Sequence, residues 1–336
     1  LKYMLDHKAS FSIYMAHGGT TFGTYNGANA PPFIPQTSSY DYDAPINESG
    51  QATEKFHSIR NLLSNYLQQG ESIPNIPAPF PAQQISNFQF SQIAPLWKNL
   101  PKPVQNDTLM LMEDLDQAYG AVLYQTKLQA GNKAKLRFKN VNDYALVYVN
   151  KVFIGTLDRI KADSTIEIPQ REKAALLEIL VEATGRINYG RYIHDRKGIH
   201  GQVILDNGQT QKVLSGWNNY PITLGEKNIP VQWQALSPQN ANAASFYKGS
   251  FTASADADTY LDMRKWNKGL VWVNGHCLGR FWNIGPTQTM FLPGCWLKKG
   301  KNEIIVFDLF GTSNPQMQSL EKPILDEVTI EVKEKK

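Results

Sequence analysis

The chain has 336 residues, of which 42% are hydrophobic, 11% aromatic and 19% charged. This composition is too apolar for a disordered protein, and no apolar run approaches the roughly 20 residues of a membrane-spanning helix. The formal net charge of +4 comes from lysines spread along the chain, so it predicts a mildly basic surface and argues against nucleic-acid binding. A chain of this length can form two or three domains.

The first residues combine the end of a helix with a strand-like apolar run. The end of a helix around Tyr3 and Met4 leads into an apolar run over 10–16, and the pair Gly18-Gly19 follows. Such a run before glycines predicts a buried strand. Leu1 is not a natural initiator, so we expect the true N-terminus to lie upstream.

A second helix is expected after a long loop. Residues 18–50 are rich in Gly, Asn, Pro and Tyr, and Thr53 is a suitable N-cap for a helix over 53–68 that stops at Gly70. One strand cannot form a sheet. Residues 1–73 are therefore expected to be the closing α/β piece of a larger domain.

Residues 74–103 contain seven of the nineteen prolines. Proline at this density keeps the backbone extended and disfavours helix, so the stretch predicts a semi-rigid linker between domains.

From residue 104 the hydrophobic pattern alternates with a period of two. The strand-like segments are short, rich in β-branched and aromatic residues, and separated by Gly, Asn, Asp and Pro. This pattern is typical of an all-β sandwich. The segments read "AKLRFKNV", "YALVYVN", "STIEIP", "LLEILVE", "TYLDM", "GLVWVNG" and "NEIIVFD".

The β-rich part also repeats. "LVYVN" at 146–150 recurs as "LVWVN" at 270–274, and Gly155 meets Gly279 at the same offset of 124. "LEILVE" echoes "NEIIVF" at an offset of 125. The matches predict two copies of one sandwich, over 104–225 and 226–336, although chance similarity between β-rich strands is the alternative.

Cysteines and acidic residues give little evidence for metal. Cys277 and Cys295 lack metal-ligand spacing and could form a disulfide or be two buried thiols, of which we favour thiols. Asp41 and Asp43 are two carboxylates without a recognisable metal-ligand pattern around them, and we do not expect a metal there.

The segment "GRYIHDRKGIHG" also fits no zinc-ligand spacing, despite His194 and His200. Asp195, beside Arg196 and Lys197, instead predicts a surface ion cluster. No nucleophile elbow, P-loop or dinucleotide motif is present.

Aromatic residues in the N-terminal zone suit a sugar. Tyr14 lies near the end of the expected buried strand, where we expect packing to fix its ring, and Tyr40 and Tyr42 alternate in "SSYDYDAP". A tyrosine offers a flat apolar face and a hydroxyl that donates and accepts, which matches the C–H patches and hydroxyls of a saccharide. The alternative is that Tyr40 and Tyr42 are strand residues that pack in a core.

Several long stretches resemble the family 35 glycoside hydrolases, the retaining β-galactosidases. "YMAHGGTTFG", "NGAN", "TSSYDYDAPINESG" and "TEKFHSIRNLL" resemble the end of their catalytic barrel. "TGRINYG", "DRKGI", "FYKGSF" and "LVWVNGHCLGRFWNIGPTQTMFLPGCWLKKGKNEIIVFD" resemble the β-domains that follow it. The resemblance covers nearly the whole chain in the right order.

The resemblance implies a multidomain α/β plus all-β fold. Residues 1–73 would be the C-terminal end of a (β/α)8 TIM barrel, with its eighth strand at 10–16 and its last helix at 53–68. After the Pro-rich linker 74–103, two β-sandwich domains of jelly-roll type would follow over 104–225 and 226–336, the second galactose-binding-like.

The resemblance also implies a function. Tyr14, Tyr40 and Tyr42 match tyrosines that contact galactose in the family. A retaining glycosidase needs two carboxyl groups about 5 Å apart. The family's two catalytic glutamates lie on earlier barrel strands, and the acid/base stands within an "ENE"-like stretch. No such stretch occurs in this chain, where Glu48 and Glu54 stand in other motifs. We expect both glutamates upstream of Leu1 and this chain alone to be inactive.

The chain is thus expected to be part of a retaining exo-β-galactosidase. It would need no metal and no organic cofactor, since two carboxyls and water suffice. Its expected partners are a β-galactoside substrate and the missing N-terminal barrel portion, with no nucleic acid and no membrane span. A homo-oligomer is left open, and the resemblance favours an extracytoplasmic location.

The β-sandwiches allow two other functions. The sandwiches could be non-catalytic carbohydrate-binding modules, or structural modules that brace the barrel or an oligomer interface. A binding module has no reason to carry a barrel strand and helix, which argues for the enzyme. Bracing is compatible with it.

Overall fold

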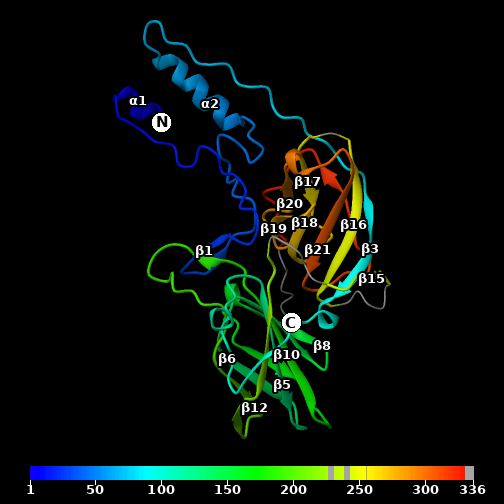
Figure 1. Cartoon of the computed structure of the whole chain (residues 1–336). Coiled ribbons are helices and arrows are strands. Elements are labelled where there is room, and N and C mark those ends of the chain that lie inside the picture. The colour runs from blue at the N-terminus through cyan, green and yellow to red at the C-terminus, as the bar shows by residue number, and fades with distance from the viewer. Residues whose placement is uncertain (226–230, 238–242, 255, 330–336) are drawn as a thin grey trace. The chain divides into compact units, whose positions relative to one another are not determined.

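The computed structural model describes residues 1–225, 231–237, 243–254 and 256–329 (Figure 1). These form two compact units. Unit 1 comprises Leu1–Gly23, Thr37–Leu96 and Trp233–Lys336, and unit 2 comprises Thr24–Gln36 and Trp97–Gln232. Each unit contains one β-sandwich.

The sandwich of unit 2 has a six-stranded sheet in the order β4-β14-β5-β10-β7-β8 and a four-stranded sheet in the order β13-β12-β6-β9. Alternating residues of both sheets, from Val122 to Trp217, form one buried core. The strands are β4 (Val104–Asn106), β5 (Ala121–Leu128), β6 (Ala134–Asn142), β7 (Tyr144–Val149), β8 (Val152–Asp158), β9 (Thr165–Ile168), β10 (Ala175–Glu182), β12 (Gly198–Asp206), β13 (Gln211–Val213) and β14 (Trp217–Ile222). Short 3-10 turns are η2 (Leu96–Lys98), η3 (Met112–Leu115) and η4 (Arg159–Lys161).

The sandwich of unit 1 has a seven-stranded sheet, ordered β15-β3-β16-β21-β18-β19 with β22 also on β3, and a three-stranded sheet ordered β20-β17-β23. Its own core includes Trp266 and Val306. The strands are β3 (Phe88–Pro95), β15 (Gln234–Ala235), β16 (Ser245–Ala253), β17 (Thr259–Asp262), β18 (Lys268–Val273), β19 (His276–Trp282), β20 (Thr289–Leu292), β21 (Gly300–Asp308), β22 (Gln316–Met317) and β23 (Ser319–Leu320). The 3-10 turn η6 (Gly294–Trp296) follows β20.

The seven strand-like segments found in the sequence all coincide with strands of these sheets. They correspond to β6, β7, β9, β10, β17, β18 and β21. The prediction of β-sandwiches is confirmed, because short segments rich in β-branched and aromatic residues and bounded by turn residues are the signal of such strands.

The repeated sequence reflects a repeated strand order. β5-β10-β7-β8 in unit 2 and β16-β21-β18-β19 in unit 1 pair antiparallel in the same sequence of neighbours. Both hairpins carry an irregularity at the same point, after Val147 and after Val271. Both also turn through an asparagine with positive φ, Asn150 and Asn274.

The second sequence match is out of register by two residues. Leu177 pairs with Val149 and Ile304 pairs with Val273, so β10 and β21 correspond at an offset of 127 rather than 125. A shift of two keeps every side chain on its own face of the sheet, so the hydrophobic pattern could not detect it.

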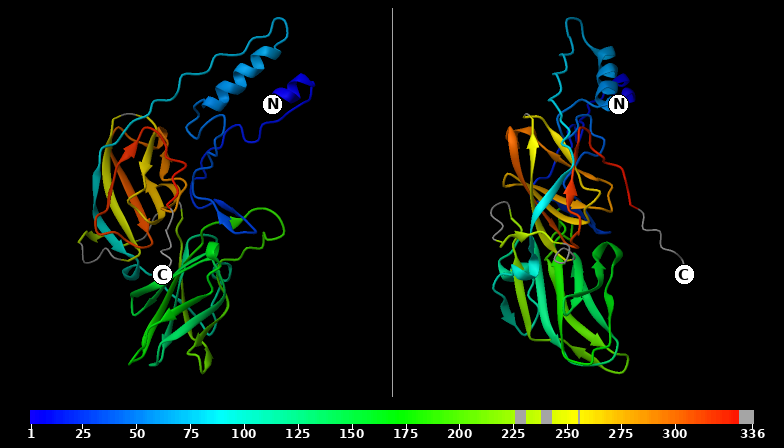
Figure 2. Two further views of the ribbon diagram at one scale, coloured as in Figure 1. Left: turned by 180° about the vertical axis from the view of Figure 1, so that it is seen from behind. Right: turned by 90° about the vertical axis from the view of Figure 1, so that its right-hand side faces the viewer.

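The proline-rich stretch contributes more than a linker. Residues Phe88–Pro95 form β3, which pairs with β16 of unit 1 although some 150 residues separate them. Figures 1 and 2 show β3, in cyan, beside the yellow β16. In the amino-acid sequence, the residues of the unit 2 sandwich therefore lie between β3 and β16, which are neighbouring strands of the unit 1 sandwich. The four-part division at residues 73, 103 and 225 stays a proposal.

Helices are few and lie near the N-terminus. α1 (Lys2–Asp6) and α2 (Glu54–Leu63) are present where the sequence predicts them, and the 3-10 turn η1 (Ser64–Tyr66) extends α2. The Thr53 hydroxyl accepts a hydrogen bond from the Phe56 N–H at 3.4 Å, which confirms the predicted N-cap.

The buried strand predicted for residues 10–16 is wrong for this structure. These residues form no strand, and most of them are exposed. A strand forms its backbone hydrogen bonds with neighbouring strands, whereas in the described part of the chain this run accepts a bond from the Ile46 N–H at its last residue, Ala16, at 2.9 Å.

Part of the long loop belongs to unit 2. β1 (Gly27–Asn29) pairs in parallel with β11 (Arg186–Ile187) and antiparallel with β2 (Ile34–Pro35). The Asn26 side chain donates to the Thr184 carbonyl at 2.8 Å.

Gly269 tests the packing of β18 against β21. A Cβ at this position would lie 1.7 Å from the Phe307 carbonyl oxygen, whereas one at Gly225 meets no atom within 4 Å. We expect Gly269→Ala to lower the free energy of unfolding by about 2 kcal/mol or more, because the strands must separate. Gly225→Ala is the control, and chemical denaturation is the measurement. Equal stabilities of the two variants would contradict this packing.

Candidate functional site

The three predicted site tyrosines lie on one cavity of unit 1. Tyr14, Tyr40 and Tyr42 all line a hollow of about 510 Å³, together with Gly18 and residues of the chain's first helix and of α2. Tyr14 is 89% exposed and Tyr42 63% exposed. The expectation that packing fixes the Tyr14 ring is therefore wrong here, because no strand forms at 10–16.

Tyr40 and Tyr42 extend to the same side of their segment. Their rings are 5.1 Å apart in an edge-to-face arrangement, while Asp41 between them is buried. This is the alternation expected of extended backbone. The core alternative does not apply to Tyr42, whose ring is mostly exposed.

The tyrosine segment is held against the glycine pair. The Tyr40 N–H donates to the Gly19 carbonyl at 3.0 Å, and a Cβ at Gly18 would lie 2.2 Å from the Tyr40 carbonyl oxygen. Only glycine permits this approach. The glycine pair in "HGGTT" is thus required for the close packing of the tyrosine segment next to the cavity.

A buried acidic pair lies beneath the same segment. The Glu48 N–H donates to Asp41 Oδ2 at 3.0 Å, and Glu48 Oε2 accepts from the Thr20 hydroxyl at 2.7 Å. Burial raises the pKa of Glu48 to about 7; the Thr20 and Ser39 hydroxyls lower it and the Asp41 charge raises it. No local sequence pattern predicts this pair, because the shared burial of Asp41 and Glu48 depends on the fold.

The loop that carries these groups is anchored on strand β19. The Gly23 N–H donates to the Cys277 carbonyl at 3.0 Å, and the Ser38 hydroxyl donates to the Arg280 carbonyl at 2.9 Å. Phe22 packs on Trp296 with ring centroids 4.5 Å apart. The loop of the N-terminal piece and the sandwich of unit 1 are therefore one packed structure.

Asp43 is the acidic residue that lines the cavity, and it is paired. Its carboxylate forms an ion pair of 2.5 Å with Lys55 of α2, and both side chains are largely exposed. Among the described residues that line the cavity, no second carboxyl group accompanies Asp43.

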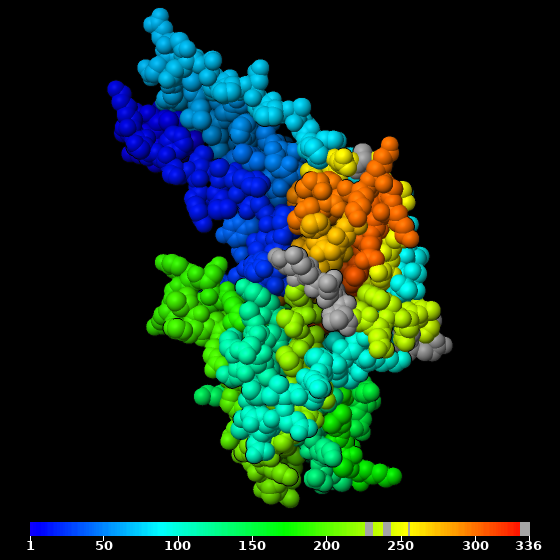
Figure 3. Space-filling view, viewed as in Figure 1, coloured from blue at the N-terminus to red at the C-terminus, as the bar shows by residue number. Residues whose placement is uncertain are grey.

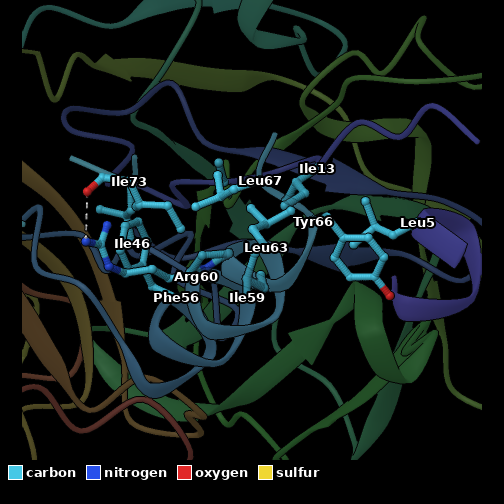
Figure 4. Close-up of a pocket in the computed structure, with 12 residues that line it drawn as sticks. Leu5, Ile13, Ile46, Phe56, Ile59, Arg60, Leu63, Tyr66, Leu67 and Ile73 are labelled. Carbon is cyan, nitrogen blue, oxygen red and sulfur yellow. Dashed lines mark hydrogen bonds between the residues drawn. The ribbon is translucent and has the colours of Figure 1, made fainter. Parts of the chain in front are cut away.

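An apolar groove adjoins the cavity. It has a volume of about 490 Å³ and runs between α1, residues 13–16 and α2. Figure 4 shows Ile59, Leu63 and Leu67 along it, with Arg60 donating to the Ile73 carbonyl at 3.5 Å. α2 has no buried residue. In Figure 3 this blue part of unit 1 lies at the surface.

The ion cluster around Asp195 is buried, so its predicted surface position is wrong. Lys197 Nζ lies 2.7 Å from Asp143 and 2.6 Å from Asp195, and Arg159 reaches the same carboxylates at 2.7 and 2.8 Å. Burial raises the pKa of Asp195, but Lys197 and Arg159 lower it more, and the net result is a lowered pKa. Phe33 covers the cluster, 4.1 Å from the Arg159 guanidinium.

The remaining candidates are simpler. Cys277 and Cys295 form no disulfide among the described residues, which agrees with the prediction of thiols, but only Cys277 is buried and Cys295 is exposed. In the described ranges, no three His, Cys, Asp or Glu side chains lie close enough together to hold a metal ion. The same ranges contain no helix that is long and apolar enough to cross a membrane.

Three family models match the chain in succession. Residues 1–66 match glycosyl hydrolases family 35, residues 110–223 the first all-beta domain of beta-galactosidase, and residues 244–302 the beta-galactosidase galactose-binding domain. Together the matches identify glycosidase domains in both units.

Individual relatives agree. The chain is 36% identical over 297 residues to a beta-galactosidase of Xanthomonas manihotis, covering 87% of this chain and 48% of that protein. It is 34% identical over 343 residues to the human beta-galactosidase-1-like protein 2, covering 96% of this chain and 51% of that protein. The chain spans about half the length of these relatives. A structure of the Pleurotus ostreatus lectin with GalNAc aligns over 72% of this chain and 86% of that chain, but its TM-score of 0.23 and 12% identity support no conclusion.

The matched domains and the β-rich units define a chain of the glycoside hydrolase class. Within that class, the chain belongs to glycosyl hydrolases family 35, and its relatives are beta-galactosidases.

The buried ion cluster gives a stability test. Lys197→Met leaves Asp143 and Asp195 facing each other with one cation, and we expect it to lower the free energy of unfolding by about 3–5 kcal/mol. Lys133→Met removes an exposed pair with Glu167 and should leave unfolding unchanged. Denaturation of both variants checks this, and a fully stable Lys197→Met protein would show that the cluster does not hold unit 2.

Proposed function

We propose that this chain is part of a retaining exo-β-galactosidase that releases terminal galactose from β-D-galactosides. The observation that carries the proposal is the convergence of Tyr14, Tyr40 and Tyr42 on one cavity, within the residues that match glycosyl hydrolases family 35. In this proposal the three hydroxyls contact the sugar, and the rings of Tyr40 and Tyr42 form a corner against its apolar patches.

The two catalytic carboxyl groups come from outside this chain in the proposal. One acts as the nucleophile and the other as the acid and then the base, about 5 Å apart, so that configuration is retained over two steps. The cavity supports this division because Asp43, its acidic residue, is paired with Lys55.

The apolar groove supports a missing barrel portion. Leu5, Ile59 and Leu63 lie along it, and an apolar groove of this kind is suited to contact with another part of a protein. We propose that residues preceding Leu1 in the complete protein supply the neighbouring strands and helices. Residues 10–16 would then become the last barrel strand, and residues 53–68 the last helix.

The sandwiches act as braces in this proposal. The hydrogen bonds from Gly23 and Ser38 to β19 support that role, because they fix the loop that carries the tyrosines. We also propose an extracytoplasmic location, from the family alone.

The chain by itself is expected to be inactive. Without two facing carboxyl groups the barrier to glycoside hydrolysis stays high. A nitrophenyl β-galactoside assay with purified residues 1–336 measures this. Turnover above that of a Glu48→Gln, Glu54→Gln control would show instead that Glu48 or Glu54 carries the reaction, and it would contradict the proposal.

The tyrosines are tested in the complete protein. Loss of one hydroxyl leaves a sugar group unpaired, at a cost of about 1–3 kcal/mol. We expect Tyr14→Phe and Tyr42→Phe to lower kcat/KM about ten-fold or more with an unchanged Tm. Tyr3→Phe, at a residue that is 73% exposed, is the control. Normal kinetics with a lowered Tm would assign the tyrosines to packing.

A further inference from the structure

We propose that Glu48 is a positioning residue: as the neutral acid, it holds the segment Tyr40–Asp41–Tyr42 in the conformation that lines the cavity. The sugar-binding role of that segment rests on the proposed function. The conformational role of Glu48 does not, and it is tested separately.

The first argument is connectivity. The Glu48 main chain donates to Asp41 Oδ2 and its side chain accepts from Thr20, at 3.0 and 2.7 Å. Thr20 in turn forms a backbone bridge with Ser39, directly before Tyr40. Glu48 thus links both sides of the loop, and Asp41 is the residue whose burial directs Tyr40 and Tyr42 to the cavity.

The second argument is the absence of a compensating cation. Glu48 is 6% exposed and Asp41 9% exposed, and no ion pair in the described part of the chain joins either of them to a Lys, Arg or His. Glu48 Oε1 is also buried with no hydrogen-bond partner among the described residues. An ionised carboxylate with an unpartnered oxygen costs much free energy at a buried position, whereas a neutral carboxyl group costs much less.

The other titratable group facing the pair is Tyr260 of β17. Burial raises its pKa to about 12, so it stays neutral at physiological pH and contributes no charge. Burial, and to a smaller extent the Asp41 charge, raise the pKa of Glu48, so ionisation of Glu48 places a negative charge beside Asp41. We expect this repulsion to break the contact between Glu48 and Asp41 and to release the tyrosine segment.

The direction of the pH effect follows from the raised pKa of Glu48, about 7 against 4.5 for an ordinary glutamate. Between these values the folded chain holds a proton that the unfolded chain has released. The stabilisation is fully present below pH 4.5 and is lost as the pH rises through 7.

Glu48→Gln keeps the shape and the neutral charge at every pH. In the 336-residue chain, we expect the Tm of this variant minus that of the wild type to rise from pH 4.5 to 7 and then to level off. Glu172→Gln, at an exposed residue, should give a constant difference. A constant difference for Glu48→Gln as well would overturn the proposal.

Local hydrogen exchange separates positioning from general stability. At pH 8, amides of residues 38–48 should exchange at least three-fold faster in the wild type than in Glu48→Gln, with no difference at pH 5. Equal exchange at pH 8 would overturn the positioning role.

The complete protein links the two proposals. There, Glu48→Gln should move the alkaline limb of the kcat/KM profile to higher pH, and Glu172→Gln should not. If the alkaline limb of the Glu48→Gln profile does not move, the proposed effect of Glu48 on the site is wrong. If the complete protein hydrolyses no β-galactoside, the proposed function fails, while the Tm and exchange measurements still decide the role of Glu48.

Discussion

The close approach of the N-terminal loop to strand β19 is the constraint on which the site of unit 1 depends. A Cβ at Gly279 would lie 2.1 Å from the Ser38 hydroxyl oxygen, so the Ser38 bond to the Arg280 carbonyl requires glycine there. Ser38 leads directly into Tyr40–Tyr42, and Gly23 is held by the same strand. Two hydrogen bonds to one strand therefore fix both parts of the loop that lie in unit 1.

In the proposed function, this arrangement gives the β-sandwich of unit 1 a role beside the tyrosine cavity. The rim of an active site is built from loops, which are mobile unless a rigid element holds them. Here β19 lies in a seven-stranded sheet over a fully buried core, which gives the loop a rigid support. The buried acid pair then sets the local conformation of the tyrosine segment within that frame.

Local patterns in the sequence were sufficient for most of the β-structure and for the N-cap of α2. Short β-branched and aromatic segments between turn residues identified β6, β7, β10, β18 and β21, and the resemblance to family 35 pointed to the three tyrosines that line one cavity. These features depend on short-range periodicity or on long motifs.

The failures concern long-range partners. β3 pairs with β16 although the two segments are far apart in the chain, and the prolines around β3 predicted a linker instead of a strand. Residues 10–16 have strand periodicity but no neighbouring strands, so they form none. Lys197 is charged and yet buried, because two carboxylates and Arg159 surround it in space rather than in sequence. The protonation of Glu48 depends in the same way on burial, which sequence alone does not show.

The account is tested most directly by a crystal structure of the complete protein with galactose bound. It predicts that the hydroxyls of Tyr14, Tyr40 and Tyr42 lie within hydrogen-bond distance of one galactose, with two carboxyl groups from residues preceding Leu1 about 5 Å apart across the anomeric carbon. Galactose bound away from all three tyrosines, with the loop still anchored on β19, would contradict it.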